Sequence, residues 1–261
     1  MSKPKLNAAT TAFDADNAWL FAEISLITYR DLDQWTDNLA EFGFKLVAQF
    51  NEKVAQALVA TNGHATVLAF RGTEFDKPAD VIADAKVRLV PGPWGRVHNG
   101  LNRALDEIWA DVEVALSKDS HAPLFITGHS MGAGMTLMAA ARLRDKNRTI
   151  QGVYAFGAPR VGNDDFAAEF SEKLGARTWR YVNDEDIIAR IPSTKMGYKH
   201  VGQLIYFNEA GQRSDQPDDG KSLREHLRQM TSDVESKEPE GMGDHLVPKY
   251  VDLVKAEAQR S

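Results

Sequence analysis

The stretch that decides the fold reads Leu124-Phe125-Ile126-Thr127-Gly128-His129-Ser130-Met131-Gly132-Ala133-Gly134. It places a serine in a Gly-x-Ser-x-Gly pattern, with an apolar run before it and a run rich in glycine and alanine after it. This context indicates a strand, a sharp turn and a helix, with Ser130 held on strained backbone angles. Side chains at positions 128 and 132 would collide with neighbouring chain, so glycine is needed at both. We therefore expect Ser130 to be a nucleophile raised clear of the sheet, beyond the carboxyl ends of its strands.

A glycine-rich turn that binds phosphate is the alternative interpretation of this stretch, because a helix N-terminus also attracts anions. Such a loop normally contains more glycines and a lysine. Residues 124–134 contain no lysine. The nucleophile is therefore the better interpretation.

Strands and helices alternate on both sides of this stretch. Strands are predicted at 45–50, 54–60, 65–70, 124–127, 152–156, 178–182 and 203–207, and helices at 16–29, 101–116, 131–144, 163–174, 223–230 and from Pro248 onward. Asn62-Gly63 predicts a hairpin, and Asn99 is the expected cap of the helix over 101–116. The alternation from residue 65 favours a mostly parallel sheet with right-handed crossovers, to which the first strands add an antiparallel edge. No linker divides residues 1–261, so one domain is expected.

The composition excludes several classes of protein. The 261 residues contain no cysteine, which excludes disulfides, thiolate metal sites and a cysteine nucleophile. A net charge of −6 argues against nucleic-acid binding and against docking on anionic lipid. No apolar run is long enough for a transmembrane segment, and no secretory signal is apparent, so a cytoplasmic location is expected, with export by another route left open. The spacing of Asp215, Asp218 and Asp219 fits no calcium loop, so no metal site is expected. No cofactor is expected either.

A serine hydroxyl is a weak nucleophile and needs a base, which a carboxylate must orient. In hydrolases with this turn the acid and then the histidine follow the serine along the chain. This order leaves His200, His226 and His245. We expect His200, at the entry to a strand, to be structural and His226 to lie on a helix surface. His245 stands in a loop before the last helix, where a base is readily presented, and is our candidate.

The orienting carboxylate should follow the end of a strand. Asp184, Glu185 and Asp186 stand in a row after the predicted strand 178–182. Asp186 directly precedes an apolar pair and is therefore the acid expected at a partly buried position, with Asp184 as the alternative.

Two preorganised donors are needed for the negative charge that develops on the carbonyl oxygen of an ester. The backbone N–H of Met131, directly after the serine, is one candidate. Thr73 is the other, because it follows the predicted strand 65–70 and Gly72 lets the backbone turn in closely.

Five motifs and a closing segment make the chain similar to the class 3 (fungal-type) lipase family of the α/β-hydrolase superfamily, over roughly residues 15–255. They are Ile27-Thr28-Tyr29-Arg30-Asp31, Phe70-Arg71-Gly72-Thr73, Val97-His98-Asn99-Gly100-Leu101, Gly128-His129-Ser130-Met131-Gly132-Ala133, Val182-Asn183 with Asp186-Ile187-Ile188 and Ile191-Pro192, and Asp244-His245 with Tyr250. The resemblance implies an α/β-hydrolase fold with helices on both faces of the sheet. It also implies a nucleophile at Ser130, an orienting acid at Asp186, a base at His245 and oxyanion donors at Thr73 and Met131.

The chain departs from the family in some places. Val81 stands where many members carry tryptophan, and Ala189 replaces a common proline. Secreted fungal members carry signal sequences and disulfides. Neither feature is expected from this sequence, so the chain looks more like bacterial members.

Residues 75–97 correspond to the segment that forms a lid over the serine in family members. Val81, Ile82, Leu89 and Trp94 are the candidates there for contact with an acyl chain or a lipid interface. The alternative is a crossover packed permanently on the sheet. Residues 208–244 are a polar insertion before the candidate base.

These features predict a serine-dependent carboxylic ester hydrolase, with a triacylglycerol lipase or esterase that forms an acyl-enzyme as the first interpretation. The expected partner is an acyl-ester lipid, with transient contact to a lipid interface through the lid. A phospholipase A1, a feruloyl-type esterase or an acyltransferase would use the same chemistry on another substrate and stays open. A non-catalytic lipase-like scaffold is the alternative from another class, but it would be expected to lose a member of the triad.

Overall fold

The computed structural model describes residues 3–72, 88–118, 121–214 and 242–260. An eight-stranded sheet lies at its centre, in the order β1-β2-β3-β6-β7-β8-β9-β10. Its strands are β1 (Lys45–Asn51), β2 (Gln56–Thr61), β3 (Thr66–Phe70), β6 (Leu124–His129), β7 (Gly152–Phe156), β8 (Thr178–Asn183), β9 (Gln203–Phe207) and β10 (Arg213–Ser214). Strands β3, β6, β7, β8 and β9 are parallel, whereas β1, β2 and β10 pair antiparallel at the two edges. The predicted parallel sheet and its antiparallel N-terminal edge are confirmed.

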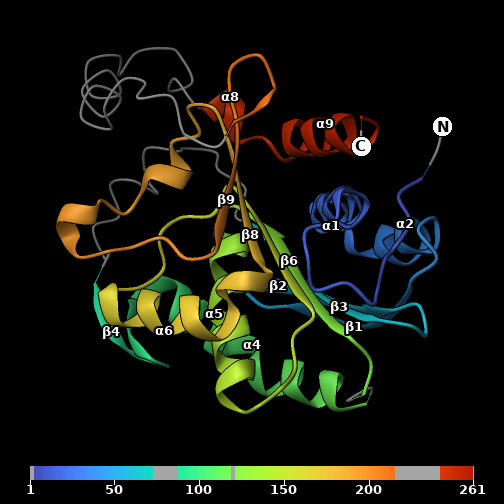
Figure 1. The fold of residues 1–261 in the computed structure, drawn as a ribbon. Coiled ribbons are helices and arrows are strands. Elements are labelled where there is room, and N and C mark those ends of the chain that lie inside the picture. Colours follow the sequence, from blue (N-terminus) through green and yellow to red (C-terminus); the bar gives the residue numbers. More distant parts are fainter. Residues whose placement is uncertain (1–2, 73–87, 119–120, 215–241, 261) are drawn as a thin grey trace.

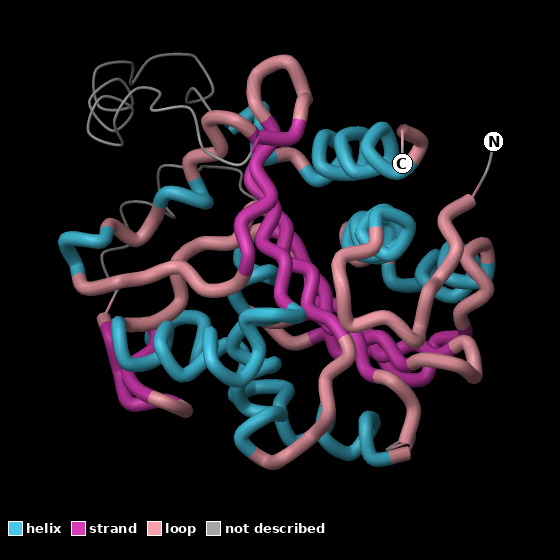
Figure 2. The backbone as a smooth tube through the Cα atoms, viewed as in Figure 1, coloured by secondary structure: helices cyan, strands magenta, loops and turns pink. Residues whose placement is uncertain are grey.

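Helices cover both faces of the sheet (Figures 1 and 2). One face packs against α1 (Ala15–Ile27), α2 (Trp35–Ala40) and α9 (Val247–Ala258), and the other against α4 (Asn99–Ser117), α5 (Met131–Asp145) and α6 (Asp164–Leu174). Successive side chains of a strand point to opposite faces, so Leu124 and Ile126 enter one core and Phe125 the other. This layered arrangement is an α/β-hydrolase fold, as predicted.

Short elements complete the described chain. They are η1 (Leu32–Gln34), η2 (Gly175–Arg177), η3 (Ile188–Arg190), η4 (Thr194–Met196), α8 (Met242–His245), and a separate hairpin of β4 (Leu89–Gly92) and β5 (Gly95–His98). No helix among the described residues is both long and apolar enough to cross a membrane.

One sequence expectation needs correction, and others concern segments outside the described residues. The cap of α4 is His98 and not Asn99, because the His98 ring accepts the backbone N–H of Leu101 at 3.3 Å. The predicted helix over 223–230 lies outside the described residues, as do most of the insertion 208–244 and residues 75–87 of the expected lid. The expectation of one domain stays a prediction.

Candidate active site

Ser130 lies on the sharp turn between β6 and α5. Its backbone angles are φ 61° and ψ −131°, a region that L-residues rarely occupy and that costs about 1–3 kcal/mol. A Cβ at Gly132 would collide with the Phe70 carbonyl oxygen and lie 2.7 Å from the Arg71 carbonyl carbon. A Cβ at Gly128 would lie 2.7 Å from the Gly132 carbonyl. The predicted need for both glycines therefore has a structural cause, and it fixes the serine where α5 begins.

The structure brings the three predicted side chains into one hydrogen-bonded chain. The Ser130 hydroxyl lies 2.8 Å from Nε2 of His245. Nδ1 of the same ring lies 2.9 Å from Oδ1 and 2.8 Å from Oδ2 of Asp186. All three side chains are buried. They come from the ends of β6 and β8 and from α8, which the parallel sheet places at one edge.

Asp186 is held as a carboxylate. Burial alone would raise its pKa, but the charge of His245 and the hydrogen bonds from His245 and Tyr250 outweigh burial and lower it. Its Oδ1 also accepts the backbone N–H of Ile188 at 2.8 Å. An ionised carboxylate can only accept, so Nδ1 of His245 donates to Asp186. The other ring nitrogen, Nε2, faces the Ser130 hydroxyl.

Gly157, directly after β7, allows the acid and the base to meet. Its φ is 59°. A Cβ there would lie 2.8 Å from Oδ2 of Asp186 and 3.0 Å from Nδ1 of His245. Any larger residue would therefore push apart the contact between Asp186 and His245.

The turn after β3 lies directly against the serine. A Cβ at Gly72 would lie 2.8 Å from the Ser130 Cβ, which brings the residue before Thr73 next to Ser130. Thr73 itself lies outside the described residues. Met131 is the first residue of α5, and the first N–H groups of a helix have no intrahelical acceptor. Its N–H is therefore suited to bind a negative oxygen beside Ser130.

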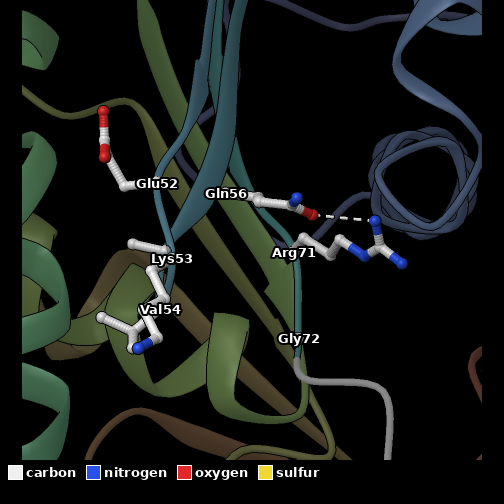
Figure 3. A pocket seen from close by; sticks show the side chains of 7 residues that line it. Glu52, Lys53, Val54, Gln56, Arg71 and Gly72 are labelled. Carbon is white, nitrogen blue, oxygen red and sulfur yellow. Dashed lines mark hydrogen bonds between the residues drawn. The ribbon is translucent and has the colours of Figure 1, made fainter.

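A pocket of about 380 Å³ opens at the same turn (Figure 3). Its lining residues are Glu52, Lys53, Val54, Ala55, Gln56, Arg71 and Gly72. Arg71 donates to the Gln56 side chain at 2.8 Å. Most of this lining is polar or charged, and of the lining residues Gly72 is the one that lies against Ser130.

Trp94, expected to contact substrate, lies elsewhere. Its Nε1 donates to Asp145 at 2.9 Å, and its ring packs against Phe166 and Phe170 of α6. Asp145 ends α5, whose 15 residues begin next to Ser130, so it lies about 20 Å from the serine at 1.5 Å per residue. Trp94 therefore anchors the β4–β5 hairpin to the helical layer. Leu89 lies in β4 opposite His98, and Val81 and Ile82 lie outside the described residues.

The alternative acid Asp184 and the histidine His200 lie outside the hydrogen-bonded chain of Ser130, His245 and Asp186. Asp184 has φ 36° and its Oδ1 accepts the Tyr206 hydroxyl at 3.1 Å. It is therefore turned to β9, whereas Asp186 meets the base. His200 is half-buried with Nε2 2.8 Å from the Ala189 carbonyl oxygen, which agrees with a structural role. His226 lies outside the described residues.

Several residues around the triad stand in the quoted motifs, but sequence reasoning assigned no role to their side chains. Tyr250 donates to Oδ2 of Asp186 at 2.5 Å, and its oxygen accepts the backbone N–H of Asn183 at 3.0 Å. Beside His245, the His129 ring has a partly buried contact with the Tyr29 hydroxyl and a buried contact with the His245 carbonyl oxygen. The signal for Tyr250 was its place on the apolar stripe of α9, five residues after His245, but such a stripe does not show that its hydroxyl is used.

Comparisons with known proteins identify relatives of part of the chain. Residues 67–196, about half of the chain, match the family model for lipase (class 3). A secreted mono- and diacylglycerol lipase of Fusarium solani is 38% identical over 109 residues, which are 40% of this chain and 32% of that protein. One from Malassezia globosa is 30% identical over 154 residues, 54% of this chain and 51% of the relative. The chain thus spans about a third to a half of these relatives.

A solved structure shares the fold. The triacylglyceride lipase of Rhizomucor miehei superposes with a TM-score of 0.68 at 22% identity, over 88% of this chain and 92% of that one.

These relatives correct one expectation and leave another without support. The cytoplasmic expectation is contradicted, because the similar lipases are named as secreted. The expected likeness to bacterial members has no support, since the relatives named above are fungal.

Proposed function

We propose, from the match of residues 67–196 to the class 3 lipase family, that the protein is a serine-dependent carboxylic ester hydrolase acting on lipid esters. The observation that carries the proposal is the continuous hydrogen-bonded chain from the Ser130 hydroxyl through His245 to Asp186. Each link has the length that proton transfer and orientation require.

In the proposed reaction the Ser130 oxygen attacks the ester carbonyl carbon while its proton passes to Nε2 of His245. Met131 and Thr73 donate backbone N–H groups to the oxygen that becomes negative. The carbon–oxygen bond then breaks, and the imidazolium returns the proton to the departing alkoxide. Water, deprotonated by the same ring, then attacks the acyl-enzyme; the bond between the Ser130 oxygen and the acyl carbon breaks, and the ring returns the proton to Ser130 as the acid leaves. Asp186 keeps the ring oriented and stabilises its positive charge.

Mono- and diacylglycerols are the substrate class that we propose first, because the similar proteins of Fusarium and Malassezia are named for these substrates. Triacylglycerols are the second candidate, supported by the shared fold with the Rhizomucor lipase.

Substrate access requires a movement, because Ser130 is fully buried. A covering segment that opens at a lipid interface would explain this burial, and we propose residues 75–87, with Val81 and Ile82 as its apolar contacts. Activity on a long-chain ester that does not rise above the solubility limit of the ester would contradict this lid.

Hydrolysis of p-nitrophenyl esters of increasing chain length, and then of mono-, di- and triacylglycerols, tests the proposed function. We expect turnover by the wild-type protein and none above background by Ser130→Ala. Equal rates for both proteins would show that the serine is not the nucleophile. No turnover of any ester by the wild type would favour the non-catalytic scaffold.

A further inference from the structure

His129, the residue between Gly128 and Ser130, is buried and has a partner at each ring nitrogen. Its Nδ1 lies 2.8 Å from the Tyr29 hydroxyl. Its Nε2 lies 2.6 Å from the backbone carbonyl oxygen of His245. The described mechanism uses neither contact, yet one of them binds the main chain of the base.

These partners determine the tautomer of His129. A carbonyl oxygen can only accept, so Nε2 must carry the hydrogen and donate to His245. Nδ1 of the neutral ring then accepts from the Tyr29 hydroxyl. The backbone of Gly72 hydrogen-bonds to Tyr29, and as an N–H donor it uses the acceptor side of that hydroxyl. Every hydrogen bond in the chain Gly72–Tyr29–His129–His245 therefore runs in one direction.

His129 also stays neutral while it makes these contacts. Burial, and then the nearby His245, lower the pKa of His129 to about 3. The two imidazole rings lie 4.6 Å apart between centroids. A second positive charge at this distance would oppose the imidazolium that forms on His245 during the reaction, so a neutral ring is the compatible one.

The main chain of the base needs such anchors. Element α8, which ends at His245, has four residues, too few to be rigid through its own helical bonds. Two side chains hold successive carbonyl groups of this segment. Asn183 donates to the Asp244 carbonyl oxygen at 2.9 Å, and His129 donates to that of His245. Asn183 stands close to the acid and His129 next to the nucleophile, so each end of the triad is tied to the backbone of the base.

We propose that His129, oriented by Tyr29, is a positioning residue that holds the His245 backbone so that its ring reaches Ser130 and Asp186 together. This inference rests on the proposed ester hydrolysis. It assigns His129 a role in turnover but none in substrate binding, because no step of the mechanism brings the buried ring against the ester.

Three substitutions of His129 distinguish the effect of its N–H donor from the effect of its packing. His129→Gln places an amide N–H close to the position of Nε2 and keeps the bond to the His245 carbonyl. His129→Asn reaches only to the position of Nδ1 and loses that bond, and His129→Leu has no donor. Because a misplacement of about 1 Å can cost on the order of 10²-fold in rate, we expect kcat for a p-nitrophenyl ester to fall about 10- to 100-fold in the Asn and Leu variants. KM should change less than about threefold, and the Gln variant should recover most of the loss.

Controls distinguish this role from simple destabilisation. His64→Gln changes an exposed histidine in the β2–β3 turn and should leave kcat unchanged. Circular dichroism and thermal unfolding identify variants that do not fold, and the polar His129→Asn keeps the test open if His129→Leu fails. The rate of labelling by a fluorophosphonate should fall in parallel with kcat, since it reports the activated serine without an ester.

Three results would overturn the inference. Wild-type kcat in folded His129→Asn and His129→Leu would show that the bond to the His245 carbonyl is dispensable. An equal loss in the Gln, Asn and Leu variants would assign the effect to packing. A loss confined to KM would place His129 in substrate binding. An inactive, unlabelled wild type would contradict the proposed function itself, which is a separate outcome.

Discussion

Tyr250 and Asp186 share a hydrogen bond of 2.5 Å, in which the phenol donates to the carboxylate Oδ2. The same phenol oxygen accepts the Asn183 backbone N–H at 3.0 Å, and the same Oδ2 lies 2.8 Å from the His245 ring. Helix α9 thereby holds both the end of β8 and the acid that follows it. The acid and base are thus supported by a group that takes no part in proton transfer.

Tyr250→Phe should lower kcat about 10-fold, because Asp186 loses one of its two side-chain donors and becomes less well oriented. The free energy of unfolding should fall by about 1.5–3 kcal/mol, the usual contribution of a hydrogen bond to a charged group. Steady-state kinetics and urea unfolding measure the two effects. Tyr198→Phe is the matched control, since within the described chain the buried Tyr198 hydroxyl has no hydrogen-bond partner. Equal losses in both variants would contradict the role of Tyr250.

Asp186→Asn should reduce kcat on the order of 10⁴-fold, as the loss of the orienting carboxylate does in serine proteases, where it favours the wrong tautomer of the base. Asp184→Asn changes the neighbouring acid that bonds to Tyr206 and should keep kcat within about threefold of wild type. Kinetics of the two variants side by side decide between the acids. A larger loss in Asp184→Asn would reverse the assignment.

Ser130→Gly should be more stable than Ser130→Ala by about 1 kcal/mol, although both are inactive. The reason is the positive φ of 61°, which glycine adopts without the steric cost that alanine pays. Urea unfolding of both variants measures the difference. A more stable alanine variant would show that the turn is not strained.

The acid dependence of stability should weaken in His129→Gln. The pKa of His129 is about 3 in the folded protein and near 6.5 in an unfolded chain. The unfolded state therefore binds the extra proton between these values, and stability falls as the pH falls from about 6.5 toward 3. Glutamine does not titrate, so the slope of unfolding free energy against pH should decrease by up to about 1.4 kcal/mol per unit. Urea titrations between pH 4.5 and 6 measure this slope, and identical slopes would show that His129 is protonated in the folded state.

The sequence was sufficient for the parallel sheet, because β6 and β7 are continuous apolar runs followed by helices. It was not sufficient for the β4–β5 hairpin. Its turn places Trp94 at φ 63°, a conformation that tertiary packing against α6 imposes and that tryptophan does not signal. The apolar residues of this segment were therefore interpreted as a lid, and Trp94 as a substrate contact.

The site was predictable where chain order limits the choice. Serine, acid and histidine follow one another, and the Gly-x-Ser-x-Gly turn identifies the first. The roles of the supporting residues could not be predicted, because Tyr250, Asn183 and Gly157 act through contacts between distant elements. A buried tyrosine on a helix stripe and a glycine after a strand have many structural explanations, and only the fold shows which atoms they approach.

Mapping the covalent adduct of a fluorophosphonate tests the central claim most directly. The wild-type protein is labelled, digested and analysed by mass spectrometry, with folded Ser130→Ala treated in parallel. We predict one modified peptide, with the phosphonate on Ser130, and no adduct in the alanine variant. Modification of another residue in the wild type, or undiminished labelling of Ser130→Ala, would contradict the assignment of Ser130 as the nucleophile.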